Sequence, residues 1–388
     1  MQFKKIEARQ ILDSRKEETV EIAIETEKGK FVSSAPSGKS TGRFEARPYA
    51  KSLQEDINFL NKIKDKEWHQ IKVNEFNDLI ELEGRVFGKI GANSLFALES
   101  CILKALAAEQ KQELWEYLCR GKPSFPYPVG NSIGGGLHTE IKGKRADFQE
   151  FLFTNKAKKF SDRVFINKKA YEIAGKILGS GEINDEGAWK THLEDEKILD
   201  VMNQVREEVE DKIEEKIEIG VDIAASTFYT GKEYFHRNKP MRLNKRQQID
   251  YILKLVREKG IFYLEDPIEE EDFLGFKEIT KNAGCLVVGD DLTVTNLTRL
   301  KKAAQNKSIN AMIVKPNQNG SLLKVKEIMD FCRKNEIKTV ISHRSGETMD
   351  TTIADLAAAW KADYIKTGVY GKEREAKLNR LVRIEKSR

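Results

Sequence analysis

The chain has 388 residues, more than a single hydrophobic core ordinarily serves, so its length favours two domains. Hydrophobic residues make up 39% of it and charged residues 33%, a balance typical of a globular protein and not of a disordered or membrane-spanning one. The net charge of +5 is small beside 67 basic and 62 acidic side chains, which gives no sign of a nucleic-acid partner.

The N-terminal third predicts an α+β domain. Val20, Ile22 and Ile24 alternate with polar residues, and a turn at 28–30 follows them, which predicts a β-hairpin. Helical periodicity then extends over 51–64, 74–82 and 93–109.

Gly and Pro residues at 121–128 mark the best candidate for a domain boundary. We therefore expect a smaller N-terminal α+β domain over residues 1–122 and a larger domain over residues 123–388.

Beyond this boundary short apolar runs alternate with stretches of helical length. The runs are 148–153, 217–224, 261–264, 285–288, 311–314, 339–341 and 364–365, and the helical stretches between them include 244–259, 293–305, 320–335 and 349–361. Alternation of this kind is typical of a parallel sheet, and about eight such units predict a (β/α)₈ barrel of α/β class. An open doubly wound sheet is the structural alternative.

The four cysteines lie far apart and show no paired spacing, so we expect free thiols in a reducing compartment. The segment 1–30 is dense in charge, and no apolar run reaches the roughly 20 residues that span a bilayer. We expect a cytoplasmic protein with no signal peptide and no membrane partner.

Polar side chains follow the later apolar runs, each at the point where a strand is predicted to end. They are Asp222, Glu265, Asp266, Asp290, Asp291, Lys315, His343, Arg344 and Lys366. One charged residue after a strand is ordinarily a loop residue or a helix cap. Because all parallel strands of a barrel end at one rim, a whole series of them predicts an active site there.

The chemical types of these side chains suit one another. Asp222, Glu265 and Asp290 offer carboxylate oxygens, and hard oxygen ligands favour Mg²⁺ over zinc or copper. Lys315 and Lys366 bring positive charge, which suits an anionic substrate such as a phosphorylated carboxylate. Neighbouring cations disfavour a protonated lysine, so we expect a lowered pKa for Lys315 and a role as a base.

At these residues the chain resembles the enolase family over almost its whole length. The matching motifs include D-S-R at 13–15, S-G-K-S-T-G at 37–42, G-A-N-S at 91–94, Q-E-F at 149–151, D-E-G at 185–187, L-E-D-P at 264–267, D-D-L-T-V-T-N at 290–296, S-H-R-S-G-E-T at 342–348 and I-K-T-G at 365–368. The two heptapeptides, in this order and spacing, are the most specific.

The resemblance implies a lyase that reversibly dehydrates 2-phosphoglycerate, a small phosphorylated hydroxy acid, to phosphoenolpyruvate in glycolysis and gluconeogenesis. It further implies a barrel of the enolase kind, two Mg²⁺ sites during turnover and a homodimer or higher homo-oligomer.

The resemblance also implies roles for individual residues. Asp222, Glu265 and Asp290 would hold the first Mg²⁺, and Ser40 would complete the second site. Lys315 would be the base, and Lys366 would hold the substrate carboxylate and the developing enediolate.

The remaining roles concern the acid and the substrate. Glu186 would be the general acid, supported by Glu150. The residues expected to contact substrate or line its pocket are His138, Gln149, His343, Arg344 and Ser345.

Three places in the chain depart from the usual pattern of the family. Lys39 stands where enolases usually have a small residue, and the segments 43–49 and 184–189 also differ. The segment 33–41 nearly matches a phosphate-binding P-loop, but Ser33 occupies a position that needs Gly.

Two functional alternatives stay open: a dehydratase of the same superfamily acting on another carboxylate, and a catalytically weak enolase-like binding protein.

Overall fold

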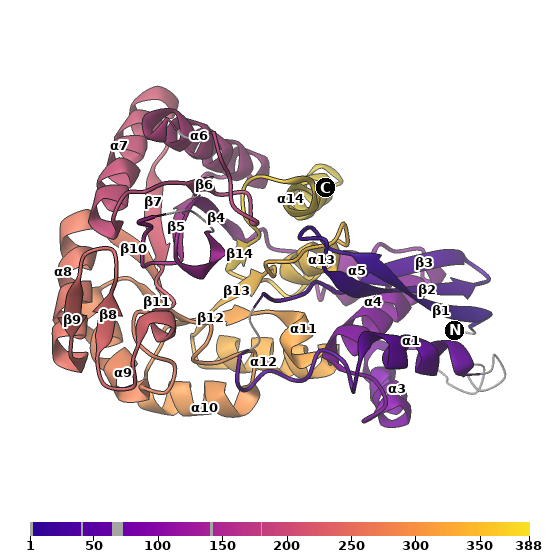
Figure 1. Cartoon of the computed structure of the whole chain (residues 1–388). Helices are drawn as coiled ribbons and strands as arrows, with labels where there is room; N and C mark the ends of the chain where they lie inside the picture. The colour runs from indigo at the N-terminus through magenta and orange to yellow at the C-terminus, as the bar shows by residue number, and fades with distance from the viewer. Residues whose placement is uncertain (1–2, 40–41, 64–72, 140–142, 180) are drawn as a thin grey trace.

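The computed structural model describes residues 3–39, 42–63, 73–139, 143–179 and 181–388, and Figure 1 shows a small sheet with its helices beside a larger ring of strands. The small sheet is antiparallel, with its strands in the order β1 (Lys5–Leu12), β2 (Glu18–Thr26) and β3 (Gly29–Ser34). Val20, Ile22 and Ile24 are fully buried on the face covered by α4 (Ala92–Glu109), which confirms the predicted hairpin.

The helices predicted in the N-terminal third are present, with shifted ends. They are α1 (Leu53–Lys62), the 3-10 turn η1 (Phe76–Asp78) with α3 (Leu79–Val86), α4, and the short α5 (Leu114–Leu118). Helix α1 begins after Ser52 because the Ser52 hydroxyl accepts a hydrogen bond from the Glu55 N–H at 3.2 Å, which caps the helix.

The larger part of the chain is a closed barrel. Its strands, in order around the ring, are β4 (Tyr127–Gly134), β5 (Glu150–Asn155), β7 (Ile217–Asp222), β10 (Ile261–Glu265), β11 (Leu286–Gly289), β12 (Ala311–Val314), β13 (Lys338–Ser342) and β14 (Tyr364–Lys366). Pairing of β14 with β4 closes the ring, and β6 (Trp189–Lys190) pairs with β4 outside it. Closure excludes the open doubly wound alternative, and every apolar run predicted as a strand overlaps a strand of the ring.

Helices surround this ring in Figure 1. They are α6 (Phe160–Leu178), α7 (Asp195–Ile213), α8 (Lys245–Lys259), α9 (Phe273–Ala283), α10 (Leu297–Asn306), α12 (Leu322–Lys334), α13 (Thr352–Ala359) and α14 (Lys372–Lys386). Shorter elements connect them: η2 (Gly136–His138), η3 (Ala225–Phe228), β8 (Tyr234–His236), β9 (Met241–Leu243) and α11 (Pro316–Asn319). None of the described helices has the length and apolar composition needed to cross a lipid bilayer.

The prediction of an all-parallel sheet is wrong at one strand. Strand β5 runs antiparallel to both of its neighbours, β4 and β7. Among the described residues of the β4–β5 connection the turn η2 is the one helical element, so no crossover helix brings β5 back parallel to β4. Strand β4 itself was not predicted, because its sequence Y-P-V-G-N-S-I-G has neither strict alternation nor a bulky apolar run.

The reversed strand has a direct consequence for the site. Because β5 is antiparallel, its first residue lies at the rim where the parallel strands end. Glu150 is paired in register with Asp222 of β7, and Asp222 with Glu265 of β10. Three carboxylates thus stand side by side on adjacent strands at one rim.

The segment after β3 brings the N-terminal part of the chain to the same rim. Ser37 and Gly346 exchange backbone hydrogen bonds of 2.8 and 2.9 Å, so residues 36–39 lie beside the loop that follows β13. The division into domains at residues 122 and 123 stays a prediction.

Candidate active site

A cavity of about 650 Å³ opens at this rim. The residues that line it and that the sequence predicted as site residues are Gln149, Glu150, Glu186, Asp222, Asp290, Lys315, His343, Arg344, Ser345 and Lys366. Glu265 is fully buried and contacts Lys366 of the lining. Ser40 lies outside the described residues, and for His138 only the backbone, at the end of η2, is described.

Lys366 is the cation at the centre of the carboxylate row. Its Nζ lies 2.8 Å from both oxygens of Glu265, 3.0 Å from Asp222 Oδ2 and 3.0 Å from Glu150 Oε2. Burial lowers the pKa of Lys366, but the charges of Asp222, Glu150 and Glu265 outweigh burial and raise it well above its usual value. Lys366 is therefore a permanent ammonium that compensates the buried carboxylates.

Lys315 and Asp290 form a second ion pair beside the first. Burial lowers the pKa of Lys315, but contact with Asp290 outweighs both burial and the repulsion from Arg344 and Lys366, so the net pKa is raised. The predicted lowering of this pKa is therefore wrong for the protein alone, because the nearest charge to Lys315 is an anion and not another cation.

The carboxylates offer ligands of the type that hard divalent cations prefer. Asp290 Oδ1 is buried without a hydrogen-bond partner among the described residues. Carboxylate oxygens of Asp266, Asp290 and Asp291 lie within 4.8 Å of one another. Among the described residues, the predicted ligands Asp222, Glu265 and Asp290 do not bring their oxygens this close together. The Lys366 ammonium contacts Asp222 and Glu265 instead, and Asp290 forms its ion pair with Lys315. The donor types fit Mg²⁺ all the same.

Asp266 differs from the other acids in what it binds. Its Oδ1 accepts the N–H of Asp290 at 3.2 Å, and its Oδ2 accepts the N–H of Asp291 at 2.7 Å. These bonds fix the turn that presents Asp290, so Asp266 serves as a structural support for a neighbouring carboxylate.

Backbone strain gathers at the rim. Ala224, Asp266, Val294 and Thr295 have φ values of +46°, +40°, +41° and +49°, a region that residues with a side chain rarely adopt. Each such residue costs on the order of 1–3 kcal/mol and clusters of them are typical of functional sites. Thr295 also accepts the N–H of Lys315 on its hydroxyl at 2.9 Å, which ties the strained turn to that lysine.

Glu186 lies on the turn before β6, lines the cavity and is buried, with 3% of its surface exposed. The turn is held by Asn184, whose Oδ1 accepts the N–H groups of Glu186 at 3.0 Å and Ala188 at 2.9 Å. Burial, together with the charges of Glu186 and Asp222, raises the pKa of Glu150 despite the nearby Lys366. A protonated Glu150 can donate a hydrogen bond to its neighbour Glu186.

Arg344 lies on the loop after β13. Its Nη2 donates to both oxygens of Glu45, at 3.2 and 3.1 Å, and its Nη1 to Asn317 Oδ1 at 3.4 Å. Glu347 accepts the Arg344 N–H at 3.2 Å and forms a buried ion pair of 2.6 Å with Lys377 of α14. The guanidinium is thus held rigidly at the cavity wall.

His343 precedes Arg344 and is buried, with no hydrogen-bond partner for its Nδ1 among the described residues. Burial, with smaller contributions from cations such as Arg374, lowers the pKa of His343 well below its usual value. This ring is therefore neutral at physiological pH.

Several residues of the site were not found from the sequence. Glu45 and Lys377 carry no motif of their own, nor does Asn131, whose Nδ2 donates to Glu186 Oε2 at 3.5 Å. Glu347, in contrast, lies inside the heptapeptide at 342–348. The sequence offered one sign of Glu45, an acidic residue shortly after the glycine-containing motif at 37–42. Lys377 lies on a charged helix face, where a buried lysine cannot be told from an exposed one.

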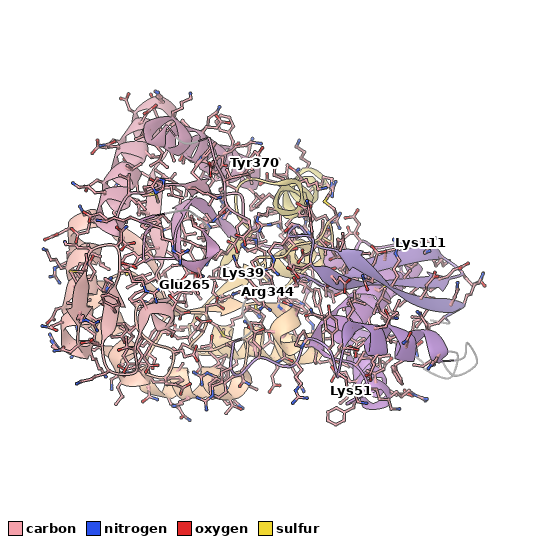
Figure 2. All side chains as sticks on the ribbon, in the orientation of Figure 1. Lys39, Lys51, Lys111, Glu265, Arg344 and Tyr370 are labelled. Carbon is pink, nitrogen blue, oxygen red and sulfur yellow. The ribbon has the colours of Figure 1, made fainter. Side chains whose placement is uncertain are left out.

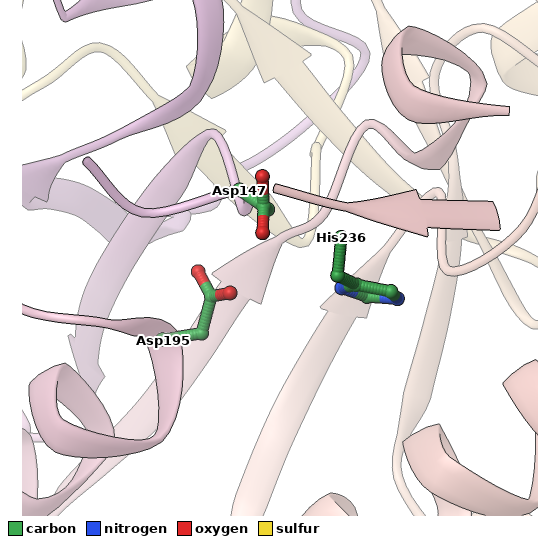
Figure 3. A group of neighbouring side chains, drawn as sticks. All are labelled: Asp147, Asp195 and His236. Atoms are coloured by element: carbon green, nitrogen blue, oxygen red, sulfur yellow. The ribbon is translucent and has the colours of Figure 1, made fainter. Parts of the chain in front are cut away.

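A second cluster of metal-ligand type lies away from the row of carboxylates. Figure 3 shows Asp147, Asp195 and His236, whose ligand atoms lie within 4.8 Å of one another. The two oxygens of Asp147 accept the N–H groups of residues 237–238 at 3.1 and 3.0 Å, and His236 Nε2 lies 2.8 Å from Gln248 Oε1. The Asp147 bonds join the chain after β8 to the loop before β5, and the His236 contact joins β8 to α8.

Comparison with known proteins finds relatives of one family along nearly the whole chain. The family profile described as "Enolase, N-terminal domain" matches residues 3–118, and "Enolase, C-terminal TIM barrel domain" matches residues 122–387. The protein named enolase from Picrophilus torridus is 35% identical over 99% of this chain and 98% of its own length. Those named enolase from Natronomonas pharaonis and Methanocorpusculum labreanum are 37% and 38% identical, over 98% and 97% of each chain. The chain therefore belongs to the enolase family of enzymes.

Proposed function

We propose that this protein catalyses the magnesium-dependent, reversible dehydration of 2-phosphoglycerate to phosphoenolpyruvate, a step of glycolysis and gluconeogenesis. The observation that carries the proposal is the meeting of two ammonium groups, Lys315 and Lys366, with buried carboxylates and the Arg344 guanidinium around one cavity. A dianion forming on a substrate carboxylate needs several preorganised cations, and this cavity offers them.

Asp222, Glu265 and Asp290 would hold the first Mg²⁺, with Ser40 completing a second site. Asp290 Oδ1 is buried and has no hydrogen-bond partner among the described residues, which supports this assignment, since such an oxygen is costly unless a cation or donor meets it. When bound, Mg²⁺ would supply positive charge to the carboxylate oxygens of the substrate and draw the charge of Asp290 away from Lys315.

Lys315 would take the proton from the carbon next to the substrate carboxylate. To do so it must be neutral before the step, which requires that its ion pair with Asp290 be weakened when the site is loaded. Lys366, which keeps its proton, would hold the substrate carboxylate and the enediolate that develops from it.

Glu186 would give its proton to the departing hydroxyl, which leaves as water. Glu150 would support Glu186 through the hydrogen bond that a protonated carboxyl can donate. Glu150 begins β5 and Lys315 follows β12, which stands opposite β5 in the eight-strand ring, so the base and the acid would act on different faces of the substrate.

Arg344 and Ser345 would hold the phosphate, since a rigid guanidinium fork matches phosphate oxygens. Gln149, His138 and His343 would complete the pocket. Gln149 already donates to Asp222 at 3.5 Å, which keeps its amide at the carboxylate row.

A homodimer or higher homo-oligomer, a cytoplasmic location and the division into residues 1–122 and 123–388 are further parts of the proposal.

One assay tests the reaction. Purified protein is given 2-phosphoglycerate with and without Mg²⁺, and the ultraviolet absorbance of the product enol is followed. We expect turnover that requires Mg²⁺ and is lost in Lys315→Ala. A folded wild type that binds Mg²⁺ and shows no turnover would overturn the proposal and favour a different carboxylate substrate or a binding role, which a screen of acid sugars then separates.

A further inference from the structure

We propose that Lys39 is a positioning residue that holds Asp185 and thereby fixes the turn carrying Glu186. The inference rests on the proposed function, in which Glu186 is the general acid. Enolases usually have a small residue at position 39, so the lysine side chain and its contacts are particular to this chain.

Lys39 joins three loops around the mouth of the cavity. Its backbone N–H donates to the Ser345 hydroxyl at 2.8 Å, and its Nζ donates to the Leu137 carbonyl at 3.3 Å and to Asp185 Oδ2 at 3.5 Å. Figure 2 places Lys39 beside Arg344 in the central region, whereas Lys51 and Lys111 lie at the periphery of the N-terminal part. A small side chain at position 39 could keep the first of these contacts but neither of the other two.

Asp185 depends on this ammonium for compensation. Its side chain is 22% exposed, and its Oδ1 is buried without a hydrogen-bond partner among the described residues. A largely buried carboxylate is costly unless a cation or donor meets it, and Lys39 is the cation that its Oδ2 contacts. Without Lys39, Asp185 Oδ2 loses this contact, and a movement of the turn that carries Asp185 further into water becomes favourable.

A shift of Asp185 passes directly to Glu186, its neighbour in the chain. The turn closes on Asn184, whose N–H donates to the Ala188 carbonyl at 2.8 Å and whose side chain accepts the Glu186 N–H. Gly187, at φ +80°, packs so closely on the Tyr370 carbonyl that a Cβ there would lie 2.5 Å from it. These contacts therefore hold the turn in one conformation, and the Lys39 ammonium adds a contact through the Asp185 side chain.

The kinetic test compares four variants with the wild type. Lys39→Met keeps the stem without the charge, Lys39→Arg keeps the charge, and Asp185→Asn removes the partner's charge. The double variant combines Lys39→Met with Asp185→Asn. Lys51→Met is the matched control, because Lys51 is 79% exposed and pairs with Glu55 on the surface.

If Lys39 acts as a tether, that is, if it holds Asp185 and so fixes Glu186, we expect kcat to fall about tenfold in Lys39→Met with KM changed less than about twofold. The reason is that a misplacement of a catalytic group by 1 Å costs up to about 10²-fold in rate. Asp185→Asn should lose a similar factor, and the double variant should be no worse than either single one. Lys39→Arg should restore most of the rate. A raised KM at unchanged kcat in Lys39→Met, with additive effects in the double variant, would overturn the tether and assign Lys39 to attraction of the anionic substrate.

A second readout needs no turnover. Hydrogen exchange of the backbone amides in residues 184–188 should be several-fold faster in Lys39→Met than in the wild type, Lys39→Arg or Lys51→Met. Unchanged exchange in Lys39→Met would overturn the tether whatever the kinetics show. If the wild type fails to turn over 2-phosphoglycerate, the proposed function fails, and the exchange comparison still decides whether Lys39 holds this turn.

Discussion

The Lys366 ammonium donates to both carboxylate oxygens of Glu265, at 2.8 Å each, although the strands that carry the two residues are not neighbours in the barrel. The contact therefore spans the mouth of the ring. Burial and the charge of Asp222 raise the pKa of Glu265 well above its usual value, and the Lys366 ammonium opposes that shift without cancelling it.

Removing this lysine should destabilise the protein in a way that a divalent cation relieves. In Lys366→Met, Glu265 and its neighbours lose their compensating charge, and breaking a buried pair costs about 3–5 kcal/mol. We expect the free energy of unfolding, measured by denaturant titration without Mg²⁺, to fall by about that amount. Addition of Mg²⁺ should stabilise the variant more than the wild type. Equal stabilisation of both proteins would show that the cation does not bind at these carboxylates.

The metal assignment predicts a shift in the Mg²⁺ concentration required for activity. Asp290→Asn should raise the half-saturating Mg²⁺ concentration by about tenfold or more, since even outer-shell changes cost about 10–100-fold in metal affinity. Asp147→Asn, in the cluster of Figure 3, is the matched control and should leave that concentration unchanged. The reverse order of effects would place the catalytic metal at the second cluster.

How much of the site could be foreseen depends on which physical signal each residue carries. Asp222, Glu265 and Lys366 were predictable because each follows a β-branched or apolar run, and parallel strands bring their ends to one rim. Glu150 was found only through the family motif. Its place at the rim comes from the antiparallel direction of β5, and strand direction leaves no mark on a period-two pattern.

Charge relations were harder to foresee than positions. The lowered pKa expected for Lys315 assumed cations as its nearest neighbours, but Asp290 is closer in the folded chain. Which of two opposite charges lies nearer depends on side-chain directions that residue order does not give. Strand β4 was missed for a different reason, because its one proline and two glycines are of types that ordinarily occur in turns.

Arg344 should contribute mainly to binding of the phosphate. Arg344→Lys keeps the charge but loses the fork geometry, and a charge-assisted hydrogen bond is worth about 1.5–3 kcal/mol. We expect the dissociation constant of 2-phosphoglycerate to rise by about 10–100-fold, measured by titration calorimetry in a Lys315→Ala background where no turnover occurs. An unchanged constant would remove Arg344 from the phosphate site.

The contact between Lys104 of α4 and Asp350 should make stability depend on pH in the acid range. Burial alone would raise the pKa of Asp350, but the Lys104 ammonium at 2.6 Å and hydrogen bonds from Thr352 hold it at about 2. An unfolded Asp has a pKa of about 3.9, so this stabilisation is complete above that value and is lost as pH falls toward 2.

Between pH 5 and pH 3 the wild type should therefore lose about 1 kcal/mol more of its unfolding free energy than Asp350→Asn does. Denaturant titrations at the two pH values measure the difference. Parallel losses in the two proteins would mean that Asp350 is not the group whose protonation matters here.

The exchange of the substrate's α-proton with solvent tests the central claim most directly. Protein, Mg²⁺ and 2-phosphoglycerate are incubated in D₂O, and incorporation of deuterium at the carbon next to the carboxylate is followed by NMR. We predict incorporation by the wild type that requires Mg²⁺ and falls at least about 10²-fold in Lys315→Ala. Incorporation at the wild-type rate by Lys315→Ala, with Mg²⁺ bound, would show that another group removes the proton and would contradict the account.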